Sequence, residues 1–220
     1  MNQRLHRRFL VSAGLICAST GAAALLAFDR LPARIPLHWN LDGTADVFGP
    51  RLAIFAFSAL MLLFGALWSL LPRLSPRRYE VERFGPVWWR SALLVVALLG
   101  YMQMMLLWRL LGGPVDMGRA LGGGLAILAI LLGNVLGKVR PNFWLGIRTP
   151  WTLASERVWY ATHRLAGKTM VLGGLLALAA LAAGAPVRFA TLAVAAAALL
   201  PAGWSLLYYK RLESAGGAGL

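Results

Sequence analysis

The stretch "LAIFAFSALMLLFGALWSLL", residues 52–71, runs for twenty residues without a single charged side chain. About twenty apolar residues in an α-helix are what is needed to cross the hydrocarbon core of a bilayer. This stretch therefore predicts a membrane-spanning helix, and the rest of the chain repeats its pattern.

Five further apolar stretches predict spans at 9–28, 87–111, 120–136, 169–185 and 189–209. The composition agrees, because 59% of the 220 residues are hydrophobic and only 14% are charged, whereas soluble domains carry about a quarter charged residues. The first stretch has the basic start and small residues of a cleavable signal peptide, but its apolar run continues beyond them, so we expect a retained anchor. The fold class predicted is all-α, a polytopic membrane bundle of six transmembrane helices.

Basic residues set the expected orientation of this bundle. The net charge of +14 is divided among clusters that alternate with the apolar stretches, the pattern of the positive-inside rule rather than of a nucleic-acid surface. The clusters lie before the first span, between the second and third, between the fourth and fifth, and after the sixth: Arg4, Arg7, Arg8; Arg73, Arg77, Arg78, Arg83; Lys138, Arg140, Arg148, Arg157, Arg164, Lys168; Lys210, Arg211. We therefore predict cytoplasmic N- and C-termini, a multi-pass protein of the cytoplasmic membrane surrounded by lipid, and no direct nucleic-acid partner.

Few polar groups fall inside the predicted spans. Gln103 is the clearest one, and we predict that it makes an interhelical hydrogen bond. The carboxylates all lie in loops or at span ends, which argues against a proton-coupled carrier. Pairs of glycines at 118/122, at 133/137 and at 173/174 favour close helix packing, within one chain or in a homo-oligomer.

The N-terminal half, residues 1–111, contains the predicted extracellular loop "DRLPARIPLHWNLDGTADVFGPR", residues 29–51. Its prolines favour extended backbone, and Asn40, Asp42-Gly43 and Gly49-Pro50 mark turns. A metal site could use His38, Asp42 and Asp46, but a second histidine is missing. Trp39 and Phe48 alone would suit an aromatic anchor at the membrane interface. A surface that faces a peptide or other partner explains the ordered turns as well.

The C-terminal half, residues 112–220, contains the predicted cytoplasmic loop "GKVRPNFWLGIRTPWTLASERVWYATHRLAGK", residues 137–168. Its turn-rich first part precedes a helix capped by Ser155, or by Thr149 with Pro150 in the first position. Apolar and basic residues fall on opposite sides of this helix, so we predict a short interfacial amphipathic helix between the fourth and fifth spans. The apolar side holds Val158, Trp159, Thr162, Leu165 and Ala166, and the basic side holds Arg157, Arg164 and Lys168.

Docking on anionic lipid would explain the basic side of this segment but not its fixed polar residues. We expect Arg148, beside Trp144 and Trp151, to order the loop and to pair with Glu156. His163 is accompanied by no serine or cysteine nucleophile with an orienting acid, so we predict no catalytic residues and no cofactor.

Both loops resemble known bacterial sequences. The segment 31–51 resembles the motif of a domain of unassigned function, and "GNVLGKVRPNFWLGIRTPWTLASERVWYATHRLAGK", residues 133–168, resembles the signature of the SdpI family. Residues that match are His38, Asn40, Gly43 and Asp46 in the first, and Asn134, Lys138, Pro141, Asn142, Gly146, Arg148, Thr149, Pro150, Trp151, Trp159, His163, Arg164 and Gly167 in the second. Trp39 and Glu156 complete the candidate ligand- or partner-binding residues.

The resemblance implies a non-enzymatic immunity protein. Such a protein protects its cell from a secreted killing peptide at the outer face, and it sequesters a cognate transcriptional repressor at the inner face of the membrane. Two alternatives remain open. A small transporter or exporter subunit would need a polar path through the bundle. A membrane-embedded enzyme acting on lipid or cell-wall precursors would need a metal held by the first loop.

Overall fold

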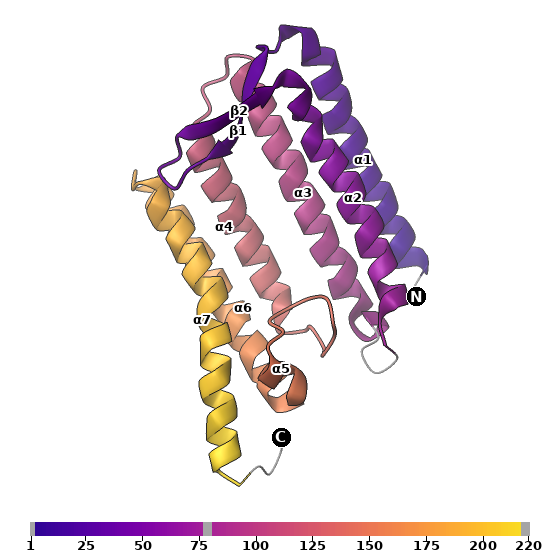
Figure 1. Cartoon of the computed structure of the whole chain (residues 1–220), viewed down its shortest axis with the longest axis vertical. Coiled ribbons are helices and arrows are strands. Elements are labelled where there is room, and N and C mark those ends of the chain that lie inside the picture. The colour runs from indigo at the N-terminus through magenta and orange to yellow at the C-terminus, as the bar shows by residue number, and fades with distance from the viewer. Residues whose placement is uncertain (1–2, 77–80, 217–220) are drawn as a thin grey trace.

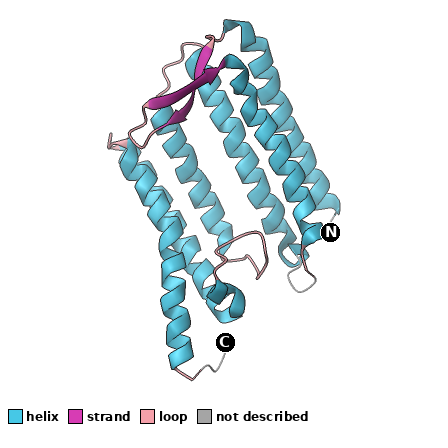
Figure 2. Cartoon of the chain, viewed as in Figure 1, coloured by secondary structure: helices cyan, strands magenta, loops and turns pink. Residues whose placement is uncertain are grey.

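The computed structural model of the chain describes residues 3–76 and 81–216, so that Arg77, Arg78 and Glu80 lie outside the described residues. Six long helices dominate it (Figures 1 and 2). They are α1 (Gln3–Ala27), α2 (Ala56–Leu70), α3 (Gly85–Leu110), α4 (Met117–Leu136), α6 (Glu156–Ala182) and α7 (Val187–Ser214). With the turns that flank them, all six are long and apolar enough to cross a membrane. The predicted all-α polytopic bundle is confirmed.

The helices form two groups of three. Helices α1, α2 and α3 pack on one another, as do α4, α6 and α7, and contacts between α3 and α4 join the groups. Figure 1 shows both ends of the chain at the same end of the bundle. That end, which also carries residues 137–155, is called the loop end below; the opposite end carries a β-hairpin and is called the hairpin end.

Glycines bring α4 and α6 into backbone contact. A Cβ atom added to Gly133 would lie 2.8 Å from the carbonyl oxygen of Gly167, and one added to Gly167 would lie 2.7 Å from that of Gly133. Farther along α6, a Cβ atom on Gly174 would lie 2.6 Å from the carbonyl oxygen of Ala126. Such close approach is how transmembrane helices associate where lipid gives no hydrophobic drive. The predicted glycine-mediated packing therefore occurs within one chain.

Gln103 ties the first three helices together. Its side chain is fully buried, its Oε1 atom accepts a hydrogen bond from Ser58 Oγ at 3.1 Å, and its Nε2 atom donates to the carbonyl of Thr20 at 3.5 Å. The predicted interhelical hydrogen bond is confirmed. Among the described residues, no lysine, arginine, aspartate or glutamate is buried.

The loop at the hairpin end contains regular structure that the sequence analysis did not predict. Strands β1 (Arg34–Trp39) and β2 (Ala45–Pro50) pair antiparallel, with His38 opposite Val47 and Trp39 opposite Ala45. The prolines and turn residues predicted extended segments and their reversal, but the pattern did not show that the two segments pair. The single-turn 3₁₀ helix Phe28–Arg30 leads into the hairpin from α1.

At the loop end, the structure corrects the predicted interfacial helix. A short helix does precede the fifth span, but it is α5 (Pro150–Ala154), and the amphipathic segment after Ser155 is continuous with the span as α6. The helix continues because no proline interrupts it, and because Gly167, which alone would cost about 1 kcal/mol relative to alanine, packs against Gly133.

Both predicted caps exist in this region. The Thr149 side chain accepts from the amide of Thr152 at the start of α5, and the Ser155 side chain accepts from the amide of Val158 at the start of α6. The predicted faces of the amphipathic segment are also present. Its basic residues are exposed, and its predicted apolar residues are buried except for the half-buried Leu165.

Candidate functional site at the two ends of the bundle

The tip of the hairpin is a tight turn organised by Asn40. Its Oδ1 atom accepts hydrogen bonds from the amides of Asp42 and Thr44, at 3.0 and 3.1 Å. Gly43 donates its amide to the carbonyl of Asn40 at 2.9 Å and has a φ of 81°, a conformation that favours glycine. Asn40 and Gly43 therefore build the turn.

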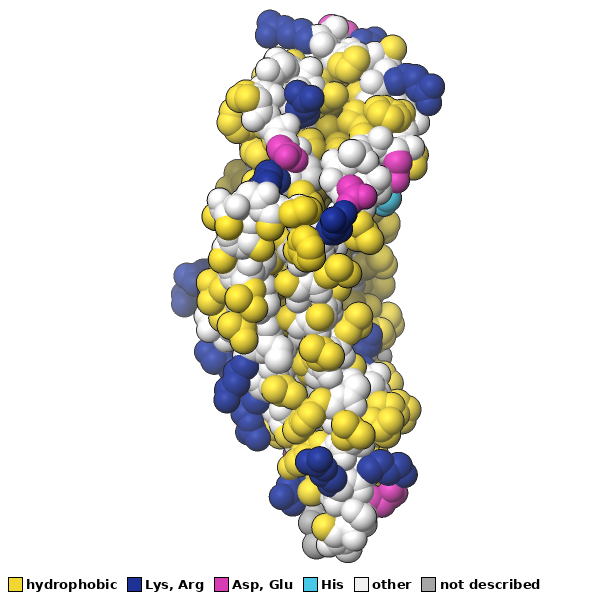
Figure 3. All heavy atoms as spheres, turned by 90° about the vertical axis from the view of Figure 1, so that its left-hand side faces the viewer, with side chains coloured by type: hydrophobic (Ala, Val, Ile, Leu, Met, Phe, Trp, Pro, Cys, Tyr) yellow, Lys and Arg dark blue, Asp and Glu magenta, His cyan; other side chains and the backbone are white. Residues whose placement is uncertain are grey.

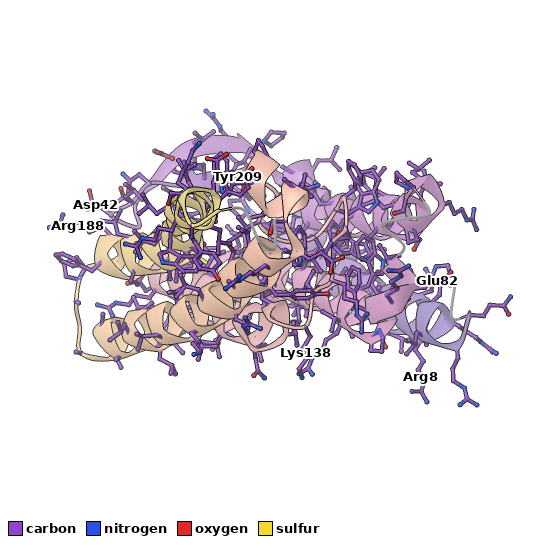
Figure 4. All side chains as sticks on the ribbon, turned by 90° about the horizontal axis from the view of Figure 1, so that it is seen from below. Arg8, Asp42, Glu82, Lys138, Arg188 and Tyr209 are labelled. Carbon is purple, nitrogen blue, oxygen red and sulfur yellow. The ribbon has the colours of Figure 1, made fainter. Side chains whose placement is uncertain are left out.

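The tip rests on the C-terminal group of helices. A Cβ atom on Gly118, in the first turn of α4, would lie only 2.6 Å from the Cα atom of Gly43. Beside this contact, Asp42 Oδ1 accepts from the Arg188 guanidinium of α7 at 3.1 Å, and Figure 4 shows these two side chains together at the edge of the bundle. A hairpin that begins in the N-terminal group is thus fastened to α4 and α7.

The base of the hairpin is anchored by apolar side chains. Ile35 is fully buried in a cluster with Leu31, Ile54, Leu106 of α3 and Met117 of α4. Trp39 is half-buried and packs against the same cluster. The hairpin therefore covers the ends of α1, α3 and α4, and Trp39 contributes to this packing.

Most of the remaining side chains of the hairpin are exposed. They include Leu37, Leu41, Val47 and Phe48, which are 44–57% exposed, and the pair His38 and Asp46. His38 Nδ1 and Asp46 Oδ1 lie 2.6 Å apart. These six residues are called the hairpin surface below.

The predicted metal candidates of this loop are separated. His38 and Asp46 are together, but Asp42 is paired with Arg188. No group of three histidine, cysteine, aspartate or glutamate side chains in the described ranges, 3–76 and 81–216, is arranged to hold a metal ion.

The loop end is shaped by the buried side chain of Asn142. Its Nδ2 atom donates to the carbonyls of Arg140 and Leu145, at 2.8 and 2.9 Å, and its Oδ1 atom accepts from the amides of Trp144 and Leu145, both at 2.7 Å. One amide thus satisfies four backbone groups and closes residues 140–145 into a compact turn.

His163 holds the next part of the loop against α6. Its Nδ1 atom lies 2.8 Å from the carbonyl of Trp159, and its Nε2 atom lies 3.0 Å from the amide of Ile147. A carbonyl only accepts and an amide N–H only donates, so Nδ1 carries the proton and the ring is neutral. Trp159 stacks on this ring at 4.1 Å between centroids and donates its indole N–H to the carbonyl of Val139 at 2.8 Å. Both ring nitrogens of His163 are therefore occupied by backbone groups.

Two tryptophans fasten the loop to other helices. Trp144 donates its indole N–H at 2.7 Å to Ser75 Oγ, which directly follows the 3₁₀ helix Leu71–Leu74 at the end of α2. Trp151 donates to Ser205 Oγ of α7 at 2.5 Å. The loop from the C-terminal group is thus tied to the N-terminal group, as the hairpin ties the two groups together at the other end.

Arg148 is placed differently from the prediction. It donates to the carbonyl of Phe143, and the ion pairs of the described residues do not include Arg148 or Glu156. The loop is ordered by Asn142 and His163 instead, because buried hydrogen bonds constrain the backbone more than an exposed arginine does. Glu156 lines a polar cleft of about 310 Å³ with Arg83, Arg140 and Tyr160, among others.

The candidate residues of the loop end therefore fall into two sets. Asn142, Trp159 and His163 are buried and shape the loop, while Gly146, Thr149 and Trp151 are half-buried within it. Asn134, Arg148, Pro150, Glu156 and Arg164 are exposed.

The sequence pattern did not indicate two residues that position the site, Arg119 and Arg188. Arg119 donates to the carbonyls of Leu181 and Ala185, at 2.6 and 3.3 Å, and so caps the end of α6. Arg188 holds the hairpin tip. Both are isolated arginines in connections that contain few other basic residues, and this isolation could have drawn attention to them. Their partners, however, lie more than sixty residues away in the sequence.

Together these features define a polytopic membrane protein with a folded loop structure at each end of its bundle. Residues 138–209 match the SdpI/YfhL protein family, and residues 15–62 match a domain of unknown function (DUF1648). Immunity protein SdpI of Bacillus subtilis (strain 168) is 27% identical over 170 residues, which cover 77% of this chain and 79% of the relative. The chain is therefore similar to the SdpI family over this C-terminal segment, and to the immunity protein over most of its length. No solved structure matches it.

Proposed function

We propose that the chain is a non-enzymatic immunity protein of the cytoplasmic membrane, with both termini in the cytoplasm. On this proposal it protects the cell from a membrane-active antimicrobial peptide at the hairpin end, and it relays the presence of that peptide by sequestering a cytoplasmic transcriptional repressor at the loop end. The relative named immunity protein supports this reading. The observation that carries it is the hairpin, an ordered surface fastened across both groups of helices.

The hairpin surface has the chemistry that an amphipathic peptide requires. It combines four exposed apolar side chains with the adjacent pair His38 and Asp46. A two-stranded sheet also has an edge on each strand, where an extended segment can add by backbone hydrogen bonds. Burial of apolar surface would supply affinity for the peptide, and the ionisable pair would supply selectivity.

The loop end suits a protein partner in the same way. Its buried residues fix the backbone, and the exposed Arg148 and the cleft lined by Arg83, Arg140 and Glu156 present charge to the cytoplasm. We propose that these exposed groups contact the repressor and that Asn142, Trp159 and His163 position them.

The absence of an enzymatic role in this proposal rests on how His38 and His163, the histidines of the two ends' candidate residues, are used. Both nitrogens of His163 are bound to backbone groups, so the ring is not free to transfer a proton. His38 is oriented by Asp46, but the hairpin between Arg34 and Pro50 contains no serine or cysteine that it could activate.

A substitution that disrupts the contact between the hairpin tip and α4 tests the proposal. Gly118→Ala places a methyl group against the backbone of Gly43, so the hairpin tip must lift from α4. Gly123→Ala is the matched control, because it adds the same methyl group to the same helix where no atom lies within 4 Å. We expect a deletion strain to become sensitive to melittin or nisin, used as membrane-active probes, and we expect Gly123→Ala but not Gly118→Ala to restore resistance at equal membrane abundance.

Two further measurements separate the parts of the proposal. The double variant His38→Ala/Phe48→Ala truncates two side chains of the hairpin surface but leaves the contact between Gly43 and Gly118 unchanged, and it should also abolish protection. Arg148→Ala should leave protection intact but release the repressor, measured as loss of a transcription factor from purified membranes. Unchanged peptide sensitivity in the deletion strain would contradict the immunity role, and full protection by the Gly118→Ala variant would contradict the role of the hairpin in it.

A further inference from the structure

A groove of about 500 Å³ lies between α4 and α6 at the loop end. It forms where the two helices cross at Gly133 and Gly167, because these residues bring the backbones together and place no side chains over the crossing. The groove opens outward from the bundle, toward the surrounding membrane.

The polarity of the groove changes along its length. On α6, Arg164 and Lys168 are followed by Leu172 and Leu175, and all four line the groove. Residues spaced by three or four lie on one helical face, with a rise of about 1.5 Å per residue, so Leu175 lies about 10 Å farther along α6 from the loop end than Lys168. The basic part is therefore at the loop end and the apolar part faces the bilayer core.

Three cations gather at the polar end. Lys138, just after α4, lies across the groove from Arg164 and Lys168, and all three are exposed. Within the described parts of the chain, none of these three side chains makes a hydrogen bond or an ion pair with the protein. Figure 4 shows Lys138 pointing outward from the bundle, and Figure 3 shows Lys and Arg side chains along one edge of the lower half, beside a hydrophobic middle zone.

We propose that this groove binds one anionic phospholipid of the leaflet at the loop end. The headgroup phosphate lies among Lys138, Arg164 and Lys168, and the exposed Asn134 donates its amide to the headgroup oxygens. One acyl chain follows Leu172 and Leu175 toward the bilayer core. The charged and apolar parts of the groove match the two parts of this one molecule.

Other occupants match the groove less well. A second copy of the chain docked symmetrically would bring three cations against three cations, which is unfavourable in the low dielectric of a membrane. A free phosphate would use the cations but leave the apolar length of the groove without a role. The lipid proposal depends only on residence in the membrane, and not on the immunity function.

The test is lipid retention by purified protein. The protein is reconstituted in vesicles of equimolar phosphatidylglycerol and phosphatidylcholine, extracted in mild detergent, and its bound lipids are counted by native mass spectrometry. We expect one retained phosphatidylglycerol. In the variant Lys138→Gln/Arg164→Gln/Lys168→Gln, the preference for this lipid should fall by about fivefold per charge, or about a hundredfold in total.

Two controls make the result decisive. Arg157→Gln/Lys210→Gln/Arg211→Gln removes three charges near the same end of the bundle but outside the groove, and should retain the lipid. Lys138→Arg/Arg164→Lys/Lys168→Arg keeps the charges and should also retain it, which shows that the charges and not the particular side chains are required. Equal loss in the first control, full retention in the glutamine variant, displacement of the lipid by inorganic phosphate, or a dimer that occupies the groove would each overturn the proposal.

Discussion

The hairpin and the loop between α4 and α5, which is the inner loop on the proposed orientation, both join the two groups of helices, but they are built in opposite ways. The hairpin is built from backbone pairing, a turn formed by Asn40 and Gly43, and an apolar base at Ile35, and most of its other side chains are exposed. The inner loop between α4 and α5 is built around buried side chains, with Asn142 and His163 holding backbone that forms no strand. Each structure nevertheless joins the N-terminal group of helices to the C-terminal group.

This difference determines what a substitution reports. In the hairpin, the exposed side chains of the hairpin surface can change without removing the contacts of Asn40, Gly43 and Ile35 that hold the backbone, so substitutions on this surface test recognition. In the inner loop, the residues that match the family signature are largely the ones that hold the shape, so their substitutions test stability first. A loss of function after changing Asn142, Trp159 or His163 therefore does not identify a contact with a partner.

The largest effect is expected for Gly146→Ala in the inner loop. Gly146 has a φ of 111°, and a Cβ atom there would lie 2.2 Å from His163 Nε2. Backbone strain of about 1–3 kcal/mol and steric overlap of a similar size give a loss of roughly 2–6 kcal/mol in the free energy of unfolding. Titration from a mild detergent into dodecyl sulfate, followed by tryptophan fluorescence, measures it.

Gly112→Ala separates the two causes of this effect. Gly112 has a φ of 92° in the turn after α3, but no atom lies within 4 Å of an added Cβ. Only the backbone strain of about 1–3 kcal/mol applies to it. Equal losses for the two variants would show that the contact between Gly146 and His163 does not hold the loop.

The next largest effect is expected for Asn142→Ala. The change removes four hydrogen bonds to backbone groups of residues 140–145, and we expect a loss of about 2–4 kcal/mol, because the freed groups regain only part of their hydration. Asn134→Ala is the matched control, since that side chain is exposed, and it should change stability by less than about 0.5 kcal/mol. The same detergent titration compares them, and a neutral Asn142→Ala variant would contradict a loop built around this amide.

The same contrast explains how far the sequence could predict the structure. Spans, caps and turns depend on residues close together in the chain, which is why the apolar stretches, the caps Thr149 and Ser155, and the turn at Gly43 could be read directly. The ties between the two groups join distant residues, Trp144 with Ser75 and Asp42 with Arg188. No local pattern encodes such pairings, and Arg148 was assigned a role that His163 performs.

The separate interfacial helix was wrong for a related reason. Charge on Arg157, Arg164 and Lys168 indicated an interfacial helix, but the pattern could not show that Gly167 packs on α4 and lets the helix continue. The amphipathic faces were correct and the boundary was not, because the faces follow from periodicity and the boundary depends on a tertiary contact.

The smallest effect is expected at the hairpin tip, for the ion pair between Asp42 and Arg188. The two side chains are 61% and 52% exposed, so a double-mutant cycle with alanine should give a coupling of only about 0.2–1 kcal/mol, and high salt should reduce it further. Detergent unfolding of the two single variants and the double variant, at low and high sodium chloride, measures it. The apolar base at Ile35 and the contact between Gly43 and Gly118 would then hold the hairpin without the ion pair. A coupling above 2 kcal/mol that resists salt would show instead that this hairpin, like the inner loop, depends on a side-chain contact shielded from water.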